Sequence, residues 1–205
     1  MKKLISFLTS IFLTSCTIVG IRTSKEAPYS VVAEFGEIQI RDYPALIIAE
    51  TEVAADYAAS GSIGFKRLAG YIFGNNQQKA KLDMTTPVYR ENPGQQIAMT
   101  APVVQQAQDD KWLMAFVMPP GYDLSNLPVP LDDKVVIKEI QAQKVAVLRY
   151  SGSLSVERIA EKSRILEDWL TTQHYKPLSK ARSAAYDPPW TIPALRRNEV
   201  HIEIE

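Results

Sequence analysis

The residues of this chain that could do chemistry are few, and their spacing matches no common catalytic motif. There is one cysteine, Cys16, and there are two histidines, His174 and His201. A zinc site needs about four Cys, His or carboxylate ligands, so these separated residues argue against one. HExxH, CxxC, P-loop and GxSxG motifs are missing, and Ser60–Gly64 resembles the last one except for Ser60 itself. We therefore expect no catalytic residues and no enzymatic activity, although a Ser-His-Asp triad without a sequence signature stays open.

Cys16 ends a segment that resembles a bacterial lipoprotein signal. Lys2 and Lys3 precede a short apolar run at 4–13, which is too short to span a bilayer. The sequence Leu-Thr-Ser-Cys at 13–16 then has the aliphatic residue, two small residues and cysteine of such signals. This resemblance implies cleavage before Cys16 and attachment of lipid, such as palmitate, to the new N-terminal residue. The alternative is a plain secretory signal with an incidental cysteine.

The lipoprotein signal predicts how the chain is organised and where it resides. Residues 1–15 are expected to be the signal peptide, 16–28 the lipidated Cys and a polar tether, and 29–205 the folded domain. Acyl chains, at about 0.8 kcal/mol per buried CH₂, would hold the protein on a membrane of the cell envelope. Thr17 is not the acidic residue that often marks retention at the inner membrane. The resemblance therefore favours the outer membrane, with the domain facing the periplasm.

Composition limits the other classes of partner. The 205 residues carry 23 basic and 23 acidic side chains, and this balance argues against nucleic-acid binding, which needs a basic excess. A chain of this length forms one domain with a sizeable core. Its single cysteine allows no internal disulfide bond, so the core must hold the fold.

A helical pattern over 61–73 is followed by two similar apolar segments. Its apolar residues recur at i, i+3, i+4 and i+7, and they are Phe65, Leu68, Ala69 and Ile72. Gly74 and Asn75 are expected to end this helix. The segments Asp83–Val88 and Ala98–Val103 each predict a strand that a proline ends or confines to an edge.

The remaining pattern predicts an α+β fold. Strands are expected over 31–53, 112–118, 135–150 and 200–204, a second helix over 155–173, and a proline-rich loop between the second and third of these strand regions. Ser155 suits the N-cap of that helix. Strands 31–53, helix 58–73 and strand 81–88 resemble in order strands 135–150, helix 155–173 and segment 181–190. We therefore predict a distorted antiparallel β-barrel of two pseudo-repeats with two flanking helices.

Two polar residues are expected on solvent faces of strands. Arg41 alternates with apolar residues near the start of the domain, and His201 alternates with Val200 and Ile202 in the last strand. His174, at the end of the second helix, is expected to interact with the helix dipole. Arg196, Arg197 and Glu199 are expected to form ion pairs or to cap the preceding loop, with anion binding as the less favoured alternative.

Three motifs together resemble the SOUL family of heme-binding proteins. They are 64–76, Met-Thr-Ala-Pro-Val at 99–103, and 186–191 with Arg-Arg-Asn-Glu-Val at 196–200. The resemblance runs in order from about residue 29 to residue 204. It implies a barrel of two repeats and non-covalent binding of heme or a related porphyrin in a shallow apolar pocket.

Heme requires an apolar slot with cations at its mouth, and its iron accepts His, Met, Cys or Tyr ligands. The resemblance places the slot at the first helix, with three apolar residues as wall, two cations on the flank and two nearby methionines. The expected binding residues are Phe65, Lys66, Arg67, Leu68, Ile72, Met84 and Met99. Each also has a plainer interpretation, as core, solvated helix face or gap-filling methionine. His174 and His201 are weak candidates for an iron ligand.

Three functions are compatible with these patterns. The first is a membrane-anchored lipoprotein that binds heme or a related tetrapyrrole, with heme and the membrane as its partners. The second is a structural or interaction lipoprotein of the envelope without a heme ligand. The third is an enzyme that acts on heme, for instance by removing its iron.

Overall fold

The computed structural model of the protein describes residues 24–92 and 111–205. The expected signal peptide, Cys16, most of the tether, and Met99 with its strand lie outside the described residues. Neither α-helix of the described part has the length and apolar character that a membrane crossing requires. The elements are β1 (Lys25–Glu26), β2 (Ser30–Phe35), β3 (Ile38–Tyr43), β4 (Leu46–Ala54), α2 (Tyr57–Ile72), β5 (Thr85–Thr86), β6 (Val88–Glu91), β7 (Lys111–Val117), β8 (Val136–Ile140), β9 (Gln143–Tyr150), α3 (Val156–Thr172), β10 (Arg182–Ala185), the 3-10 helix η1 (Pro193–Leu195) and β11 (Asn198–Ile204).

The described chain divides into two compact units. Unit 1 contains Ser30–Asp42 and Lys144–Glu205, and unit 2 contains Glu26–Tyr29 and Tyr43–Gln143. Each unit has its own helix and its own apolar core. The two are described separately below.

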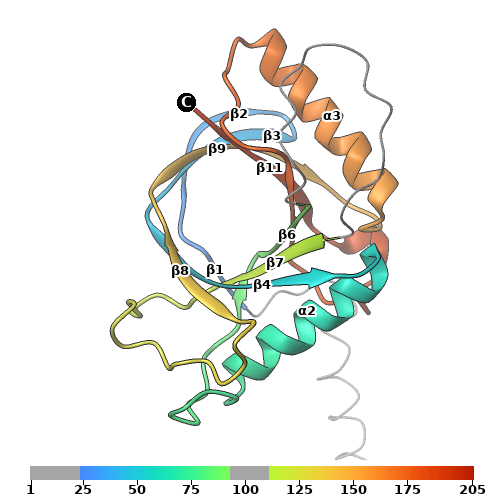
Figure 1. Ribbon diagram of the computed structural model, residues 1–205. Coiled ribbons are helices and arrows are strands. Elements are labelled where there is room, and N and C mark those ends of the chain that lie inside the picture. The colour runs from blue at the N-terminus through green and yellow to red at the C-terminus, as the bar shows by residue number, and fades with distance from the viewer. Residues whose placement is uncertain (1–23, 93–110) are drawn as a thin grey trace, which may run out of the picture. The chain divides into compact units, whose positions relative to one another are not determined.

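Unit 2 is an antiparallel sheet with α2 on one face (Figure 1). Its strand order is β6-β7-β4-β8, so β7 is central, as its two apolar faces predict. Facing residues such as Thr51 and Met114 set the register of β4 and β7. The core lies between sheet and helix, and includes Ala49, Leu68, Tyr71, Ile72, Met114 and Phe116.

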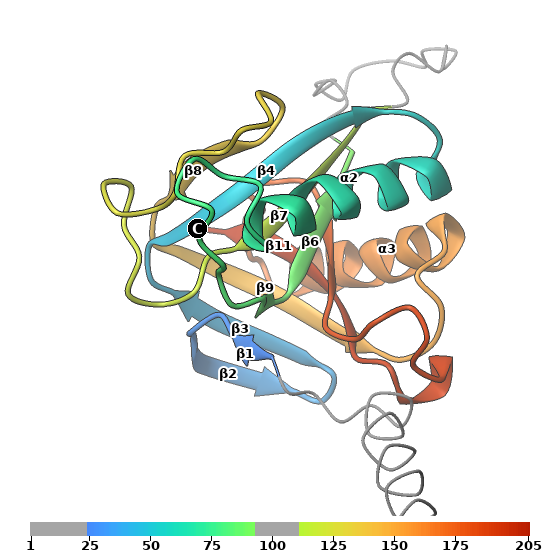
Figure 2. The same ribbon diagram turned by 90° about the horizontal axis from the view of Figure 1, so that it is seen from below.

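Unit 1 has the strand order β2-β3-β9-β11-β10 with α3 on one face (Figure 2). β11 is antiparallel to β9 and to β10. The core under α3 takes every second residue of β3, β9 and β11, as expected for a sheet with one face on a helix. It includes Ile38, Ile40, Ala146, Leu148, Leu166, Leu170, Val200 and Ile202.

The two units have the same order and pairing of strands around their helix, which confirms the predicted pseudo-repeat. In unit 2 the chain runs β4-α2-β6-β7, and β7 pairs with both β4 and β6. In unit 1 it runs β9-α3-β10-β11, and β11 pairs with both β9 and β10. The predicted α+β fold class, with antiparallel strands and two flanking helices, is therefore confirmed.

The helix ends follow the capping residues. Asp56 caps α2 by accepting a hydrogen bond from the backbone N–H of Ala59 at 2.8 Å. Gly74 has a φ of +113° just beyond the end of α2, as expected of a glycine that stops a helix. Ser155, the predicted cap of α3, accepts from the N–H of Arg158 at 3.3 Å. α3 lies within one residue of the expected 155–173, and α2 begins one residue before the range 58–73 and four before the apolar pattern at 61–73.

Candidate functional site

The apolar stripe predicted on α2 is divided between core and surface. Leu68 and Ile72 are buried, at 0% and 1% exposure, against β4 and β7. Phe65 is 42% exposed. Leu68 and Ile72 are therefore core residues, which matches the plainer interpretation of the stripe. Phe65 is the residue among these three that reaches solvent.

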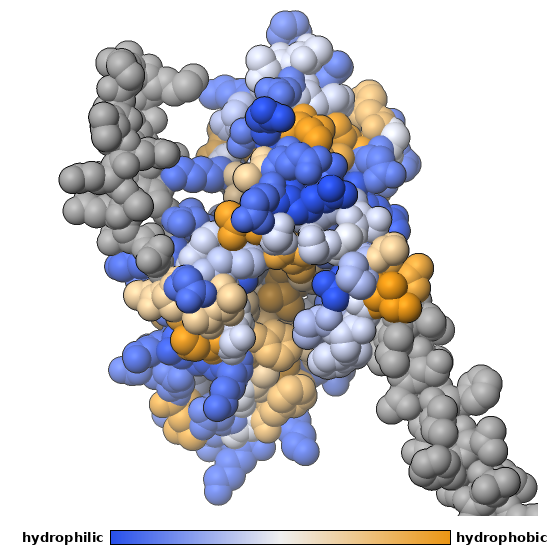
Figure 3. All heavy atoms as spheres, turned by 90° about the vertical axis from the view of Figure 1, so that its right-hand side faces the viewer, coloured by the Kyte–Doolittle hydropathy of each residue, from blue (hydrophilic) through white to orange (hydrophobic). Residues whose placement is uncertain are grey.

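Phe65 belongs to a half-exposed apolar area that we call the Phe65 surface, defined by Phe65, Met84 and Val88. The Phe65 ring packs edge-on against Phe116 at 5.4 Å between centroids. Val88 lies opposite Phe116 in the β6-β7 register, and Met84 and Val88 pack on the same core cluster. Apolar side chains also reach the surface among hydrophilic ones in Figure 3. A planar apolar molecule could therefore contact Phe65 without entering the core.

The two cations expected beside this stripe differ in availability. Lys66 is exposed to solvent. Arg67 donates to the Thr51 hydroxyl at 2.6 Å and pairs with Asp132 at 3.3 Å. These contacts fasten α2 to β4 and to the loop before β8, so Lys66 is the better candidate for a ligand carboxylate.

The motif that resembles GxSxG serves close packing. A Cβ on Gly61 would lie 2.8 Å from the Arg90 guanidinium, and one on Gly64 would lie 3.3 Å from Met114. The Arg90 guanidinium stacks over the Tyr57 ring at 3.6 Å from its centroid. Glycines at these two positions let the first turns of α2 approach β6 and β7 closely.

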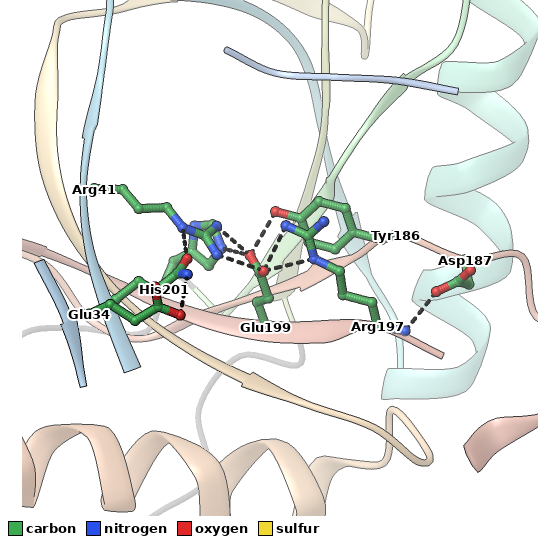
Figure 4. A network of polar contacts seen from close by, with 8 residues as sticks. Glu34, Arg41, Tyr186, Asp187, Arg197, Glu199 and His201 are labelled. Carbon is green, nitrogen blue, oxygen red and sulfur yellow. Dashed lines mark hydrogen bonds and ion pairs between the residues drawn. The ribbon is translucent and has the colours of Figure 1, made fainter. Parts of the chain in front are cut away.

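A buried polar network surrounds Glu199 in unit 1 (Figure 4). Arg41 donates two hydrogen bonds to the Glu199 carboxylate, at 2.9 and 3.0 Å. Arg197 donates to Oε1 at 2.9 Å and Tyr186 to Oε2 at 2.7 Å. His201 Nε2 lies 2.8 Å from Oε2. Two guanidinium groups and one carboxylate thus meet inside the protein.

The expectation that Arg41 and His201 lie on solvent faces is wrong. Arg41 is 2% exposed and His201 is 0% exposed. The pleat does place them opposite the α3-facing side chains, as alternation predicts, but this second face is buried too. Arg41 and His201 both contact the Glu199 carboxylate on this face, with Arg41 and Glu199 separated by 158 positions in the sequence.

The expected roles of the Arg-Arg-Asn-Glu segment are confirmed. Arg197 forms an ion pair with Glu199 at 2.9 Å. Arg196 caps the preceding loop by donating to the carbonyl oxygens of Thr191 at 2.7 Å and Pro189 at 2.5 Å. This segment was therefore the sequence signal for the network, but it did not reveal Arg41, Tyr186 or His201 as partners.

The network shifts the pKa values of its acid and its base. Burial alone would raise the pKa of Glu199, but hydrogen bonds and charge from His201 and Arg41 hold it far below its usual range. Burial lowers the pKa of His201 to about 4, against the opposing effect of Glu199. Glu199 is therefore ionised and His201 neutral at pH 7.

No three His, Cys, Asp or Glu side chains gather as a metal site within 24–92 and 111–205. His174 is exposed just after α3, with a φ of 59°. His201 is held against Glu199. Both belong to unit 1, whereas the Phe65 surface belongs to unit 2.

Replacing Glu199 by Gln should destabilise the protein strongly. The amide keeps the shape but leaves Arg41 and Arg197 buried without their counter-charge, which costs about 3–5 kcal/mol in comparable pairs. Urea unfolding followed by circular dichroism would measure the loss. Glu205→Gln, at the exposed pair with Lys176, should change stability by about 1 kcal/mol or less. Equal effects of the two substitutions would contradict the role given to the network.

Replacing His201 by Gln should flatten the dependence of stability on pH between about 6.5 and 4.5. The unfolded chain takes up a proton on its histidine below pH 6.5, whereas folded His201, with its pKa of about 4, stays neutral. Stability should therefore fall on acidification over this range, by about 2 kcal/mol. Glu199 adds to the pH dependence of stability only below its ordinary pKa of 4.5, where the unfolded chain protonates this carboxylate and the folded protein does not.

Unfolding free energies measured at intervals across this pH range would check the slope. His174→Gln, on an exposed side chain, should keep the slope of the unsubstituted protein. A slope that persists in His201→Gln and disappears in His174→Gln would refute the assignment.

Solved structures of several proteins share this fold at low sequence identity. The EcmrR C-terminal domain matches with a TM-score of 0.57 and 13% identity over 86% of this chain and 98% of that one. EcmrR in a DNA complex matches with a TM-score of 0.59 and 13% identity, over 82% and 57%. A Listeria innocua protein described as a hydrolase matches with a TM-score of 0.52 and 7% identity, over 85% and 94%. These likenesses show the fold alone.

A search of curated proteins found no match to this chain. The family model described as SOUL heme-binding protein matches residues 24–203. This range contains both helices, the Phe65 surface and the whole Glu199 network, and it includes the three motifs that first indicated the resemblance. The chain belongs to the SOUL heme-binding protein family.

Proposed function

We propose that this protein is a lipid-anchored envelope protein that binds heme or a related tetrapyrrole. The observation that carries the proposal is the family match over residues 24–203. Heme binding is the property by which that family is described. The chemistry of iron would come from the ligand, and the residues of the chain would bind and orient it.

The Phe65 surface is the proposed contact for the ring. A tetrapyrrole is flat and largely apolar, and Phe65 offers an aromatic side chain that is 42% exposed and firmly backed by Phe116. Leu68 and Ile72 would contribute indirectly, because they hold α2 on the sheet. Lys66, exposed next to Phe65, would pair with a propionate.

Met84 is the proposed candidate for an iron contact in the described part of the chain. Its side chain is half-buried on the same core cluster as Val88, and thioether sulfur is a ligand that heme iron accepts. Met99 keeps the same candidate role from its sequence motif. Arg67 would act only after leaving Thr51 and Asp132.

The proposed anchor is lipid on Cys16. The support is the sequence at 13–16, together with the lysines and apolar run before it. Ser24, where the described structure begins, lies eight positions after Cys16, and eight extended residues span at most about 28 Å. A lipid there would keep the domain close to the membrane surface, in our proposal that of the outer membrane.

Replacing Phe65 by Ala should weaken hemin binding about tenfold. Truncation removes about half of a phenylalanine contact, worth about 1–2 kcal/mol. The measurement is a hemin titration of the chain without residues 1–16, followed by the shift of the Soret band, with circular dichroism to confirm folding.

Phe73→Ala provides the matched control, because Phe73 is 62% exposed at the other end of α2 and should leave the titration unchanged. Equal affinities of the two variants would remove the Phe65 surface from the proposal. Absence of any saturable Soret shift in the unsubstituted protein would favour the interaction protein without a heme ligand. Metal-free porphyrin accumulating with excess hemin would instead favour an enzyme acting on heme.

Replacing Cys16 by Ser should prevent lipidation and maturation in a bacterial host. The measurements are incorporation of labelled palmitate and the mass of the chain in membrane and soluble fractions. Ser15→Ala keeps a small residue before the cysteine and should be lipidated normally. Labelled palmitate in the Cys16→Ser protein, which has no other cysteine, would contradict the proposed attachment to that thiol.

A further inference from the structure

A cavity in unit 2 lies under the proline-rich loop that leaves β7. Its volume is about 360 Å³, within the range typical of small-molecule sites. None of the three residues of the Phe65 surface lines it. The lining residues that matter here are Pro28, Met118, Pro119, Pro120, Tyr122 and Glu139.

The loop that forms one wall is held in place along its length. The Asp123 carboxylate accepts hydrogen bonds from the backbone N–H groups of Ser125 and Asn126, at 2.8 and 3.0 Å. Tyr71 donates to the carbonyl oxygen of Pro128 at 2.9 Å. A wall fixed in this way needs little ordering when a ligand binds, which favours affinity.

The proline part of the lining offers hydrogen-bond acceptors and no backbone donors. Pro28, Pro119 and Pro120 have no backbone N–H but each keeps its carbonyl oxygen. The N–H of Met118 is already donated to the carbonyl oxygen of Ile47 at 2.8 Å. An ionised Glu139 only accepts. These groups favour a hydrogen-bond donor on the ligand, and Tyr122 is the lining residue whose side-chain hydroxyl can donate as well as accept.

Charge selects in the same direction. Glu139 is the one charged side chain among the cavity-lining residues. The neighbouring Lys138 pairs instead with Glu50, at 2.8 Å, and Glu139 itself accepts from the neutral amide of Gln141 at 3.2 Å. Glu139 is exposed, its carboxylate is not neutralised by these neighbours, and it would favour a cation over an anion by a small margin.

Apolar and aromatic groups complete the cavity. Met118 and Pro119 are buried lining residues, and Tyr122 is 38% exposed in the loop. An aromatic ring beside a carboxylate favours organic cations, because both attract positive charge. An apolar body and an ammonium group are the two features that these walls would accept together.

We propose that this cavity binds an amphipathic organic amine, with its apolar body on Met118 and the prolines and its ammonium group at Glu139. The site is separate from the proposed tetrapyrrole surface and opposite to it in charge preference. It would let the protein hold a cationic amphiphile independently of heme.

Three probes with one body and different charge test the proposal. We choose 4-phenylbutylamine, 4-phenylbutanol and 4-phenylbutyrate, each titrated into the mature chain at pH 7 by calorimetry. The protonated amine should bind saturably, the alcohol about fivefold more weakly, and the acid more weakly still. Equal affinities for amine and alcohol, or tighter binding of the acid, would overturn the proposal.

Substitutions then locate the site. Glu139→Gln should weaken amine binding about fivefold and leave alcohol binding unchanged. The unchanged alcohol binding also shows that the variant is folded. The matched control is Glu52→Gln, on an exposed carboxylate outside the cavity, which should leave both affinities as they were. An unchanged amine affinity in Glu139→Gln would refute the role of Glu139.

A second pair of variants tests the cavity itself. Ala45 is an exposed lining residue just before β4. Ala45→Phe should fill the cavity and abolish binding of amine and alcohol alike. Ala142→Phe, exposed but outside the lining, should not. Saturating amine should leave the hemin titration unchanged, and competition between amine and hemin would contradict two separate sites. If the protein binds the amine but no hemin, the proposed heme function fails and this proposal stands.

Discussion

One buried carboxylate organises unit 1. Glu199 is 0% exposed, and an ion taken out of water is stable only when opposite charge and hydrogen bonds surround it. Arg41, Arg197, Tyr186 and His201 meet that requirement together. Because these partners come from β3, from β11 and the residue just before it, and from the segment just after β10, the requirement fixes how those elements lie within the unit.

The two units solve the same packing problem with different residues. Their central strands, β7 and β11, hold equivalent places in the same connection. β7 is apolar on both faces, with Met114 and Phe116 under α2. β11 keeps apolar residues only under α3 and places Glu199 and His201 on its other face. The repeat therefore conserves the helix-facing side of the sheet and varies the side opposite to it.

The sequence predicts features that depend on local spacing and fails where distant partners decide. Ser155, the α2 stripe and the central place of β7 follow from capping and alternation, which act over a few residues. Alternation also separates the two faces of β3 and β11 correctly. Alternation cannot show that both faces are buried. Arg41 and His201 are buried because each contacts the Glu199 carboxylate, which lies 158 positions from Arg41 and two positions from His201. The prolines after β7 predict a loop, but only the structure shows that this loop and Glu139 line the same cavity.

The same limit applies to the ligand. A stripe of four apolar residues on a helix predicts both a core and a binding surface, and the sequence does not say where one ends. The divide falls between Leu68, at 0% exposure, and Phe65, at 42%, because Leu68 points at β4 and β7 whereas Phe65 leans on the edge of Phe116. In both proposals, a ligand of this unit therefore contacts groups at the margin of the core. At one margin the groups are an aromatic ring and an exposed lysine, which suit a flat dianion. At the other they are proline carbonyls and a carboxylate, which suit a cation, so charge would favour a different kind of ligand at each margin.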